Sequence, residues 1–318
     1  MDFTVAICTH DRAAALDVTL GTLSHLSAPG ITYEILLVDN ASTDETPAVA
    51  AQWRDRGLPL RVVSESTLGL SSARNRAIEE AIGSYILFLD DDVSVGPGLL
   101  AAYHRTAGEF PDAPFMGGPI VPVFEGEATP LARAILEAKP GAYSALNLGE
   151  SPQFLEPTAG PWGANCCIRR ACIGAERFDQ RLCYVGRGGI VGDEVEFLTR
   201  IAQRCGPGRW VPDASLQHRI PVSRATWSFL ERHARGSGRT QMRHEMLHEG
   251  HQQVSLRTVL QYERRFLSHW MDNRRGSAGL ADQVRLRYSV WKERGRADEA
   301  RDMWLGRSPI ANQRAPRP

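Results

Sequence analysis

This chain of 318 residues has only two lysines, and it has no long apolar run and no net excess of charge of one sign. All but Lys139 and Lys292 of its 37 basic residues are arginines, and 37 acidic residues balance them. We therefore expect no nucleic-acid partner. No segment approaches the ~18 consecutive apolar residues that a membrane span needs, and no basic segment with a cleavage site precedes the first apolar stretch. These absences predict a cytoplasmic protein.

Paired cysteine spacings are missing as well, and no internal repeat is visible. No CxxC pattern occurs, and most of the cysteines adjoin apolar residues. Buried free thiols are therefore favoured over zinc ligands or disulfides. The six residues are Cys8, Cys166, Cys167, Cys172, Cys183 and Cys205.

Enough apolar residues are present to bury a full core, because 42% of the chain is hydrophobic. The zero net charge hides a division between two parts of the chain. Residues 1–218 contain 17 Lys and Arg against 27 Asp and Glu, a balance of −10, whereas residues 219–318 contain 20 against 10, a balance of +10. The last third is therefore a basic face or tail.

Strand-like and helix-like patterns alternate over the first 125 residues, which predicts βαβ units and a mostly parallel sheet. The predicted strands cover residues 3–8, 33–38, 60–64, 85–89 and 115–123, and the helices begin near Arg12, Thr46, Ser71 and Pro97. In the third helix the apolar positions leave Arg74 and Arg76 to other faces. Proline and glycine predict a loop-rich connection over residues 117–163. A further helix is predicted from Asp193 to about Arg204, and amphipathic helices from Trp227 onward.

Three adjacent carboxylates, Asp90, Asp91 and Asp92, follow a buried strand directly. They repel one another unless a cation neutralises them, so they predict a metal and ligand site. The segments after the first two strands bring further polar residues to the same edge of the sheet, where open α/β proteins bind ligands. Capping of the following helices is the alternative explanation for the isolated acidic residues there, above all for Ser42 to Asp44.

Four ordered motifs closely resemble the family 2 glycosyltransferases of GT-A fold, over roughly residues 3–220. They are Thr9-His10-Asp11-Arg12, Val38-Asp39-Asn40-Ala41-Ser42-Thr43-Asp44, Leu68-Gly69-Leu70-Ser71-Ser72-Ala73-Arg74-Asn75-Arg76-Ala77 and Phe88-Leu89-Asp90-Asp91-Asp92. The resemblance implies an α/β, GT-A-type, Rossmann-like and mostly parallel sheet with helices on both faces, followed by a helical C-terminal extension. We expect a nucleotide-binding half at 1–125, an acceptor and catalytic half at 126–220, a basic helical extension at 221–307 and a disordered tail at 308–318.

The same resemblance implies where the donor nucleotide binds. Thr9, His10, Arg12, Asp39 and Asn40 would hold the nucleotide, with the Asp39 carboxylate facing a uracil ring. The start of the third helix, with Arg74, would lie by the diphosphate. In the acidic run, Asp90 would face the ribose beside Asp91, while Asp92, together with His218, would hold a divalent cation. Hard oxygen ligands without a Cys/His cluster favour Mn²⁺ or Mg²⁺ over zinc.

The segment from Gly160 to Arg170 and the segment from Gly188 to Phe197 resemble the acceptor half of the family. Trp162, Gly163 and Asn165 would contact the donor or acceptor sugar, with core packing as the alternative for Trp162. The acidic pair that opens the family's next helix is reversed here. By register Glu194 is the predicted catalytic base and Asp193 the reserve candidate, although acidic residues at a helix N-terminus also simply stabilise the helix. We expect the crowded carboxylates to raise at least one pKa.

The sequence thus predicts an inverting glycosyltransferase that takes a sugar from a nucleotide-diphosphate donor, with UDP favoured and dTDP or GDP as alternatives. The acceptor would be a carbohydrate or a lipid-linked hydroxyl. A nucleotidyltransferase and a non-catalytic sugar-nucleotide or glycan-binding module are the competing interpretations. The arginines around Gly236-Ser237-Gly238, namely Arg232, Arg235 and Arg239, suggest a flexible loop over the diphosphate or acceptor. The basic third predicts either contact with an anionic membrane, at its inner face, or a role in the fold or in a homo-oligomer.

Overall fold

The computed structural model describes residues 1–182, 192–248, 254–272 and 279–310. Two compact units divide the chain. Unit 1 comprises Met1–Glu125, Tyr143–Asp179 and Asp193–Ile220, and unit 2 comprises Gly126–Ala142, Gln180–Gly192 and Pro221–Pro318. Gly126–Ala142 thus groups with the C-terminal helices, and the boundaries predicted from the sequence stay predictions. The roles assigned to the four predicted segments stay predictions.

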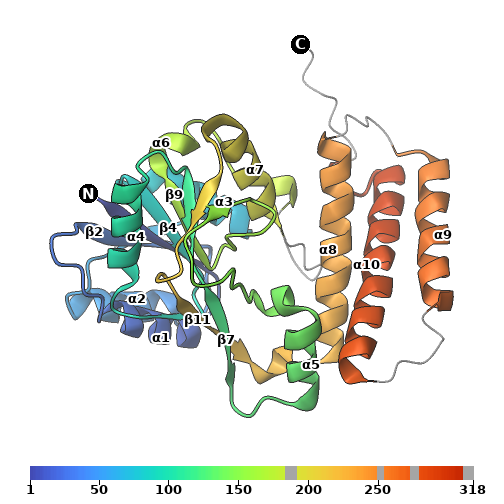
Figure 1. Cartoon of the computed structure of the whole chain (residues 1–318), viewed down its shortest axis with the longest axis horizontal. Coiled ribbons are helices and arrows are strands. Elements are labelled where there is room, and N and C mark those ends of the chain that lie inside the picture. The colour runs from blue at the N-terminus through green and yellow to red at the C-terminus, as the bar shows by residue number, and fades with distance from the viewer. Residues whose placement is uncertain (183–191, 249–253, 273–278, 311–318) are drawn as a thin grey trace. The chain divides into compact units, whose positions relative to one another are not determined.

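The first half of unit 1 is a βα succession in which the predicted elements are confirmed, with helix starts within two residues. Its elements are β1 (Phe3–Thr9), α1 (Ala13–Leu23), β2 (Tyr33–Asp39), α2 (Thr46–Asp55), β3 (Leu60–Ser64), α3 (Leu70–Glu80), β4 (Tyr85–Leu89), β5 (Val93–Val95) and α4 (Leu99–Glu109). β1 pairs in parallel with both β2 and β4, and β2 with β3. Right-handed crossovers then place α1 and α2 on one face and α3 on the other, because the chain reverses its direction across the sheet after β3 (Figure 1).

The large sheet continues past β4 with mixed strand directions, in the order β3-β2-β1-β4-β9-β6-β10-β8. A smaller sheet has the order β5-β11-β7. The remaining elements of unit 1 are β6 (Phe115–Gly117), β7 (Ile120–Glu125), β8 (Phe154–Leu155), β9 (Asn165–Arg169), α6 (Arg170–Ile173), α7 (Asp193–Cys205), β10 (Gly208–Trp210) and β11 (Leu216–Pro221). The mostly parallel α/β class predicted from the sequence is confirmed, and the antiparallel partners lie beyond β4.

The single strand predicted over residues 115–123 is wrong, because two strands in different sheets replace it. Gly117 and Gly118 lie at the break, where the chain passes so close to other segments that side chains do not fit. A Cβ atom at Gly118 would lie 2.1 Å from the carbonyl oxygen of Ala214. The loop-rich connection predicted after it contains a helix, α5 (Pro130–Ala138), whose start was readable from the sequence. Thr129 caps it by accepting a hydrogen bond from the Ala132 amide, 3.1 Å away.

The central strands form the core of unit 1. Every side chain from Ile35 to Val38 in β2 is fully buried, as expected for parallel strands covered on both faces. The five described cysteines are free thiols, as predicted, while Cys183 lies outside the described residues. Burial raises the pKa of Cys8 to about 12, so this thiol stays protonated at the end of β1.

Three long helices dominate unit 2, namely α8 (Trp227–His248), α9 (Leu256–Asp272) and α10 (Leu280–Trp304), with α10 between the other two (Figure 1). The flexible loop predicted around Gly236–Gly238 is wrong, since these residues lie within α8. A Cβ atom at Gly238 would lie 2.0 Å from the carbonyl oxygen of Lys292 in α10, and one at Gly295 would lie 2.1 Å from that of Arg235. The glycines therefore allow the two backbones to approach closely.

Ion pairs between α8 and α10 involve several of the arginines in the last third. Glu299 is fully buried and accepts hydrogen bonds from Arg239 and Arg243, both at 2.8 Å. Arg235 donates to Asp298 at 2.5 Å. The predicted tail lies mostly beyond the described residues, which end at Ile310. Among the described segments, no helix is both long and apolar enough to cross a membrane.

Candidate functional site

The carboxyl ends of the parallel strands in unit 1 meet at one rim of the sheet. In the strand register Thr9 of β1 lies opposite Asp39 of β2, which lies opposite Ser64 of β3. The acidic run Asp90–Asp92 follows β4, which is the other neighbour of β1. The structure therefore brings the predicted nucleotide and metal residues to one edge, because neighbouring parallel strands end side by side.

The loops after β1 and β2 are held together by the polar residues predicted to contact the nucleotide. His10 is exposed, and its Nδ1 lies 2.8 Å from the carbonyl oxygen of Asn40. The Asn40 carboxamide is buried; it donates to the Thr67 carbonyl and accepts from the Gly69 amide, both at 2.8 Å. Asp39 accepts a hydrogen bond from the Ser42 amide at 3.0 Å. Asn40 thus fixes the loop before α3, while His10 and Asp39 remain partly accessible at the rim.

Asp91 points into the protein rather than out of the rim. Its two carboxylate oxygens accept hydrogen bonds from Thr9 Oγ1 and from Arg12 Nε, both at 2.7 Å. Arg12 also donates to Asp92 at 2.5 Å. Burial raises the pKa of Asp91 to about 6, although the Arg12 guanidinium acts to lower it. Thr9, Arg12 and Asp91 therefore form an internal network of side chains next to Asp92.

Asp90, Asp92 and His218 form a cluster suited to a cation, since their ligand atoms all lie within 4.8 Å of one another. His218 is buried and lies in β11, with its Nε2 3.1 Å from Asp92 Oδ1. Its Nδ1 lies 2.9 Å from the carbonyl oxygen of Tyr143, so this nitrogen donates and Nε2 faces the two carboxylates. A carbonyl that fixes the ring in this way is typical of metal-ligating histidines. Two carboxylates and an oriented imidazole therefore fit a divalent cation.

The electrostatics of this cluster agree with that fit. Burial, and then the charge of Asp92, raise the pKa of Asp90. Burial lowers the pKa of His218, but the Asp92 carboxylate more than offsets it, so this pKa lies above its ordinary value. Packed carboxylates gain stability from a nearby positive charge, which a cation supplies. Arg74 and Glu194 also act on the pKa of Asp90, so this cluster and the acidic pair share one electrostatic environment.

The acidic pair at the start of α7 is bound by one buried arginine. Arg74 NH1 donates to both oxygens of Asp193 at 3.1 Å, and its NH2 donates to Glu194 Oε1 at 3.0 Å. Ser71, one turn earlier in α3, donates to Asp193 at 2.8 Å. The arginine side chain is only 3% exposed, whereas that of Glu194 is 20% exposed. Arg74 was expected to face the diphosphate from an outer face of its helix. Instead it is buried against the two carboxylates.

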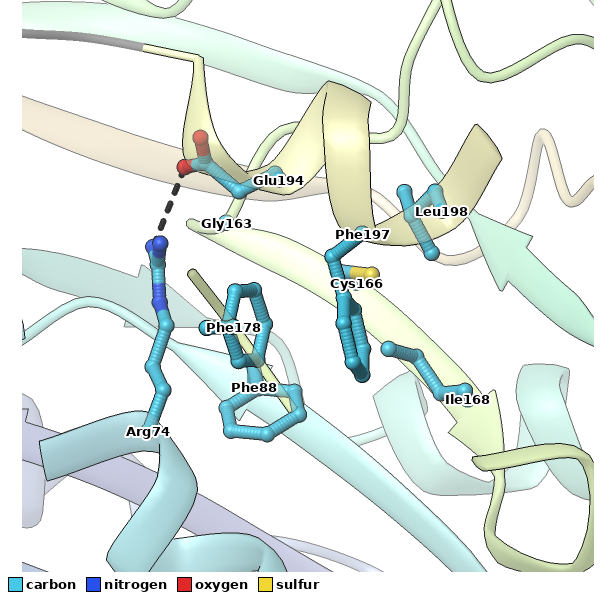
Figure 2. Close-up of a pocket in the computed structure, with 9 residues that line it drawn as sticks. All are labelled: Arg74, Phe88, Gly163, Cys166, Ile168, Phe178, Glu194, Phe197 and Leu198. Atoms are coloured by element: carbon cyan, nitrogen blue, oxygen red, sulfur yellow. Dashed lines mark hydrogen bonds and ion pairs between the residues drawn. The ribbon is translucent and has the colours of Figure 1, made fainter. Parts of the chain in front are cut away.

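Figure 2 shows Arg74 and Glu194 in contact with each other at one side of a pocket that apolar side chains otherwise line. Phe197 of α7 stacks on Phe178, with ring centroids 4.0 Å apart, and Arg74 lies over the Phe178 ring at 5.3 Å. This packing sets the position of the first turn of α7. A Cβ atom at Gly163 would lie 2.0 Å from Arg74 NH2 and 2.6 Å from Glu194 Oε1. Only glycine therefore fits beside the ion pair as it stands.

The two carboxylates of the pair differ in their pKa values. Burial, and then the charge of Glu194, raise the pKa of Asp193 to about 7, although Arg74 acts to lower it. Burial also acts to raise the pKa of Glu194, but Arg74 more than offsets it, so this pKa lies below its ordinary value. The expectation that crowding raises at least one pKa therefore holds for Asp193. Glu194 stays ionised and is the more exposed of the two.

The residues predicted to contact the sugar lie in three different environments. Asn165 is fully buried at the start of β9; its carboxamide accepts from the Tyr103 hydroxyl at 2.7 Å and donates to the Ala214 carbonyl at 2.8 Å. A sugar contact by Asn165 would have to replace these bonds. Trp162 packs half-buried against the core, and Gly163 borders the acidic pair. The segment Gly188–Val191 of the predicted motif lies outside the described residues.

Two features that hold the site residues in position were not predicted from the sequence. The first is the Tyr143 carbonyl that orients His218, which no side-chain pattern signals. The second is the aromatic pair that seats α7. One signal for it existed in the sequence, since Phe178, in the loop after α6, and Phe197, in α7, lie on either side of the acidic pair.

Comparisons with known proteins agree with this geometry. Residues 4–145 match the family described as Glycosyl transferase family 2. A validoxylamine A glucosyltransferase of Streptomyces hygroscopicus subsp. jinggangensis is 26% identical over 94% of this chain and 70% of its own length. The putative glycosyltransferase EpsH of Bacillus subtilis is 33% identical over 25% of this chain and 23% of its own. The chain thus spans about two thirds of the length of the first relative and a shorter part of the second.

Two solved structures share the fold. A mannosyltransferase of Pyrobaculum calidifontis, in complex with GDP-Man and Mn²⁺, superposes with a TM-score of 0.54 at 17% identity, covering 98% of this chain and 76% of that one. Staphylococcus aureus TarS 1-349, in complex with UDP, gives a TM-score of 0.55 at 15% identity, covering 96% and 92%. At these identities the likeness establishes the fold.

A mostly parallel sheet of this topology, with polar residues at its carboxyl rim, is the GT-A fold of these two structures. Residues 4–145 match glycosyltransferase family 2, the family that the motif resemblance predicted. The comparisons favour neither a nucleotidyltransferase nor a non-catalytic binding module.

Proposed function

We propose that this protein is an inverting glycosyltransferase that moves a sugar from a nucleotide-diphosphate donor to an acceptor hydroxyl. The observation that carries the proposal is the pairing of two clusters in unit 1. One is the Asp90, Asp92 and His218 set, and the other is the acidic pair held by Arg74. The first suits the departing diphosphate and the second suits the attacking hydroxyl.

Asp90, Asp92 and His218 would hold the divalent cation. A cation bound there would supply the positive charge that stabilises the departing diphosphate. The mixed donor set favours Mn²⁺ over Mg²⁺, because Mg²⁺ prefers oxygen ligands alone. In this proposal Asp90 is a metal ligand, whereas the sequence suggested that it faces the ribose. Asp92 would exchange its contacts with His218 and Arg12 for contacts with the cation.

Glu194 is the proposed base. Its side chain is partly exposed and ionised, and Arg74 engages its Oε1, which leaves Oε2 for a substrate proton. The acceptor hydroxyl would give its proton to Glu194 while its oxygen forms a bond to the anomeric carbon. The bond from that carbon to the diphosphate oxygen would break in the same step, with the electron pair leaving on the diphosphate. A single displacement of this kind inverts the anomeric configuration.

Asp193 and Arg74 would then be positioning residues. Asp193 is more buried and is bonded through both oxygens, so it holds the arginine rather than the acceptor. Arg74 would keep Glu194 in one rotamer and in its charged form. The raised pKa of Asp193 keeps it as the alternative base, because general bases work best with a pKa near the operating pH.

The donor is proposed to be a UDP-linked sugar. TarS was solved with UDP and with UDP-GlcNAc, and the Pyrobaculum mannosyltransferase was solved with GDP-Man. Different proteins of this fold therefore bind different nucleotides. In this chain Asp39, partly accessible at the rim, is the residue proposed to face the uracil, with His10 beside it. The proposed acceptor is a carbohydrate or lipid-linked hydroxyl, and the proposed location is the cytoplasm.

Replacing one ligand of the proposed cation site tests this function. Asp92→Ala should abolish Mn²⁺-dependent binding of UDP, measured by calorimetry, and lower sugar-nucleotide turnover by ~10²-fold or more. Asp213→Ala removes a carboxylate that is 71% exposed elsewhere in unit 1, and serves as the matched control. Wild-type activity in Asp92→Ala, or full activity of the unaltered protein in excess EDTA, would exclude this metal site.

A further inference from the structure

Helix α9 carries a stripe of exposed apolar side chains, which we name the α9 stripe. It consists of Leu256, Leu260, Leu267 and Met271, with exposed fractions of 50%, 51%, 49% and 59%. At 100° per residue these positions fall within about 60° of one another around the helix, over a length of about 22 Å. Counting Trp270, this one helix holds five of the 18 exposed large hydrophobic side chains among the described residues.

The α9 stripe is not the face by which this helix joins unit 2. Val259 and Tyr262 point the other way, where they are buried with Met242 of α8 and Ala300 of α10. The Tyr262 hydroxyl donates to Glu245 at 2.8 Å, which fixes that inner face. The stripe therefore remains exposed to solvent although the opposite side of the helix is packed. Its apolar character is not explained by packing within the described part of the chain.

Arginines border the α9 stripe on one side. Arg257 and Arg264 are exposed, and neither has an acidic side chain within ion-pair distance among the described residues. Glu263 of the same helix faces inward to Arg294 at 3.2 Å and Arg301 at 3.6 Å. Arg235, Arg239 and Arg243 of α8 are paired within unit 2, whereas these two are available to an outside anion. This arrangement of apolar and cationic side chains is typical of helices that lie in a membrane interface.

A second copy of the chain fits the α9 stripe less well. Arg264 borders the stripe about midway along its length. If two such helices paired in antiparallel orientation through their stripes, each Arg264 would lie close to the Arg264 of the other copy. Like charges at that distance oppose association. Anionic lipid headgroups would instead neutralise Arg257 and Arg264 together while the apolar side chains enter the acyl layer. We propose that α9 binds unit 2 to the surface of an anionic membrane, by a contact that does not depend on the proposed catalytic step.

Two matched double variants of the full chain test this proposal. Leu260→Glu with Leu267→Glu places two carboxylates in the α9 stripe. Val222→Glu with Leu305→Glu makes the same change of charge at positions that are 48% and 44% exposed, in unit 2 but outside the stripe. Co-sedimentation would be measured with vesicles of phosphatidylglycerol and phosphatidylcholine, and with vesicles of phosphatidylcholine alone.

The unaltered chain should sediment with the anionic vesicles and not with the neutral ones, and less so as salt rises. The stripe variant should lose this binding by ~10-fold or more, because charge replaces buried apolar surface, while the control variant keeps most of it. Arg257→Gln with Arg264→Gln should weaken binding without changing the apolar surface. Circular dichroism and UDP binding would report the fold. Equal losses in both double variants, no binding of anionic vesicles at low salt, or a stripe variant that changes only the oligomeric mass would overturn the proposal.

Discussion

At the scale of single residues, the acidic pair shows how one buried cation gives two neighbouring carboxylates different properties. Arg74 contacts both, yet the pKa of Asp193 rises to about 7 while that of Glu194 falls. The difference follows from position, since Asp193 is the more deeply buried, and burial raises its pKa although the hydrogen bond from Ser71 acts to lower it. Gly163 contributes by what it lacks, because any side chain there would displace the arginine.

The choice between the two carboxylates is tested by amide substitution. Glu194→Gln keeps the shape of the side chain but cannot accept a proton, so we expect turnover to fall by ~10²-fold or more with donor binding retained. Steady-state turnover and calorimetric binding of UDP with Mn²⁺ would be measured for both variants. Asp193→Asn should cost less turnover and should shift the pH profile, since it changes the charge beside Arg74. If Asp193→Asn were the inactive variant and Glu194→Gln stayed active, the base would be Asp193.

At the scale of elements, unit 2 depends on the close approach of α8 and α10. Two glycines allow it, one from each helix, and each would place a Cβ atom about 2 Å from a backbone oxygen of the other helix. The same interface holds Glu299, which is fully buried and bonded to two arginines. Removing one partner of such a buried set is costly, because a charge is left unpaired.

Alanine at Gly238 should therefore destabilise the protein, although alanine normally favours a helix. We expect Gly238→Ala to lower the free energy of unfolding by ~1–3 kcal/mol through overpacking. Gly108 lies in α4 with nothing within 4 Å of its Cβ position, so Gly108→Ala should instead raise stability by ~0.5–1 kcal/mol. Urea unfolding followed by circular dichroism compares the two. If Gly238→Ala raised the free energy of unfolding instead, α8 and α10 could move apart without cost, which would contradict the prediction.

At the scale of the whole molecule, charge is unevenly distributed, with a balance of −10 over residues 1–218 and of +10 over residues 219–318. Some of the arginines in the last third are paired within unit 2, where those of α8 contact acidic residues of α10. The others include the two arginines that border the α9 stripe. The basic third therefore has both a structural use, which the ion pairs show, and a proposed use at a membrane.

Donor choice is also a property of the whole molecule, and ligand-induced stabilisation measures it. A sugar nucleotide that binds only the folded protein should raise stability by ~2.7 kcal/mol at a concentration 100-fold above its Kd. We expect UDP-sugars, in the presence of Mn²⁺, to raise the melting temperature more than dTDP- or GDP-sugars, and to lose most of this effect without the metal. A larger shift with GDP-sugars would reassign the donor. The Asp92→Ala variant should show no metal-dependent shift with any of them.

Local pattern determined much of this protein. The apolar runs fixed the four parallel strands, and because such strands end side by side, the polar residues that follow them had to meet at one rim. The ligand site at Asp90 and Asp92, and the resemblance to family 2, could therefore be predicted from the sequence. Tertiary packing decided the rest. Arg74 turned inward because two carboxylates from a segment more than a hundred residues away surround it, and Asn165 is enclosed by groups from three other segments. Gly238 suggested a loop in the sequence, but the structure places it in α8, where its missing side chain lets α10 approach. Close approach of two backbones leaves no pattern in the local sequence.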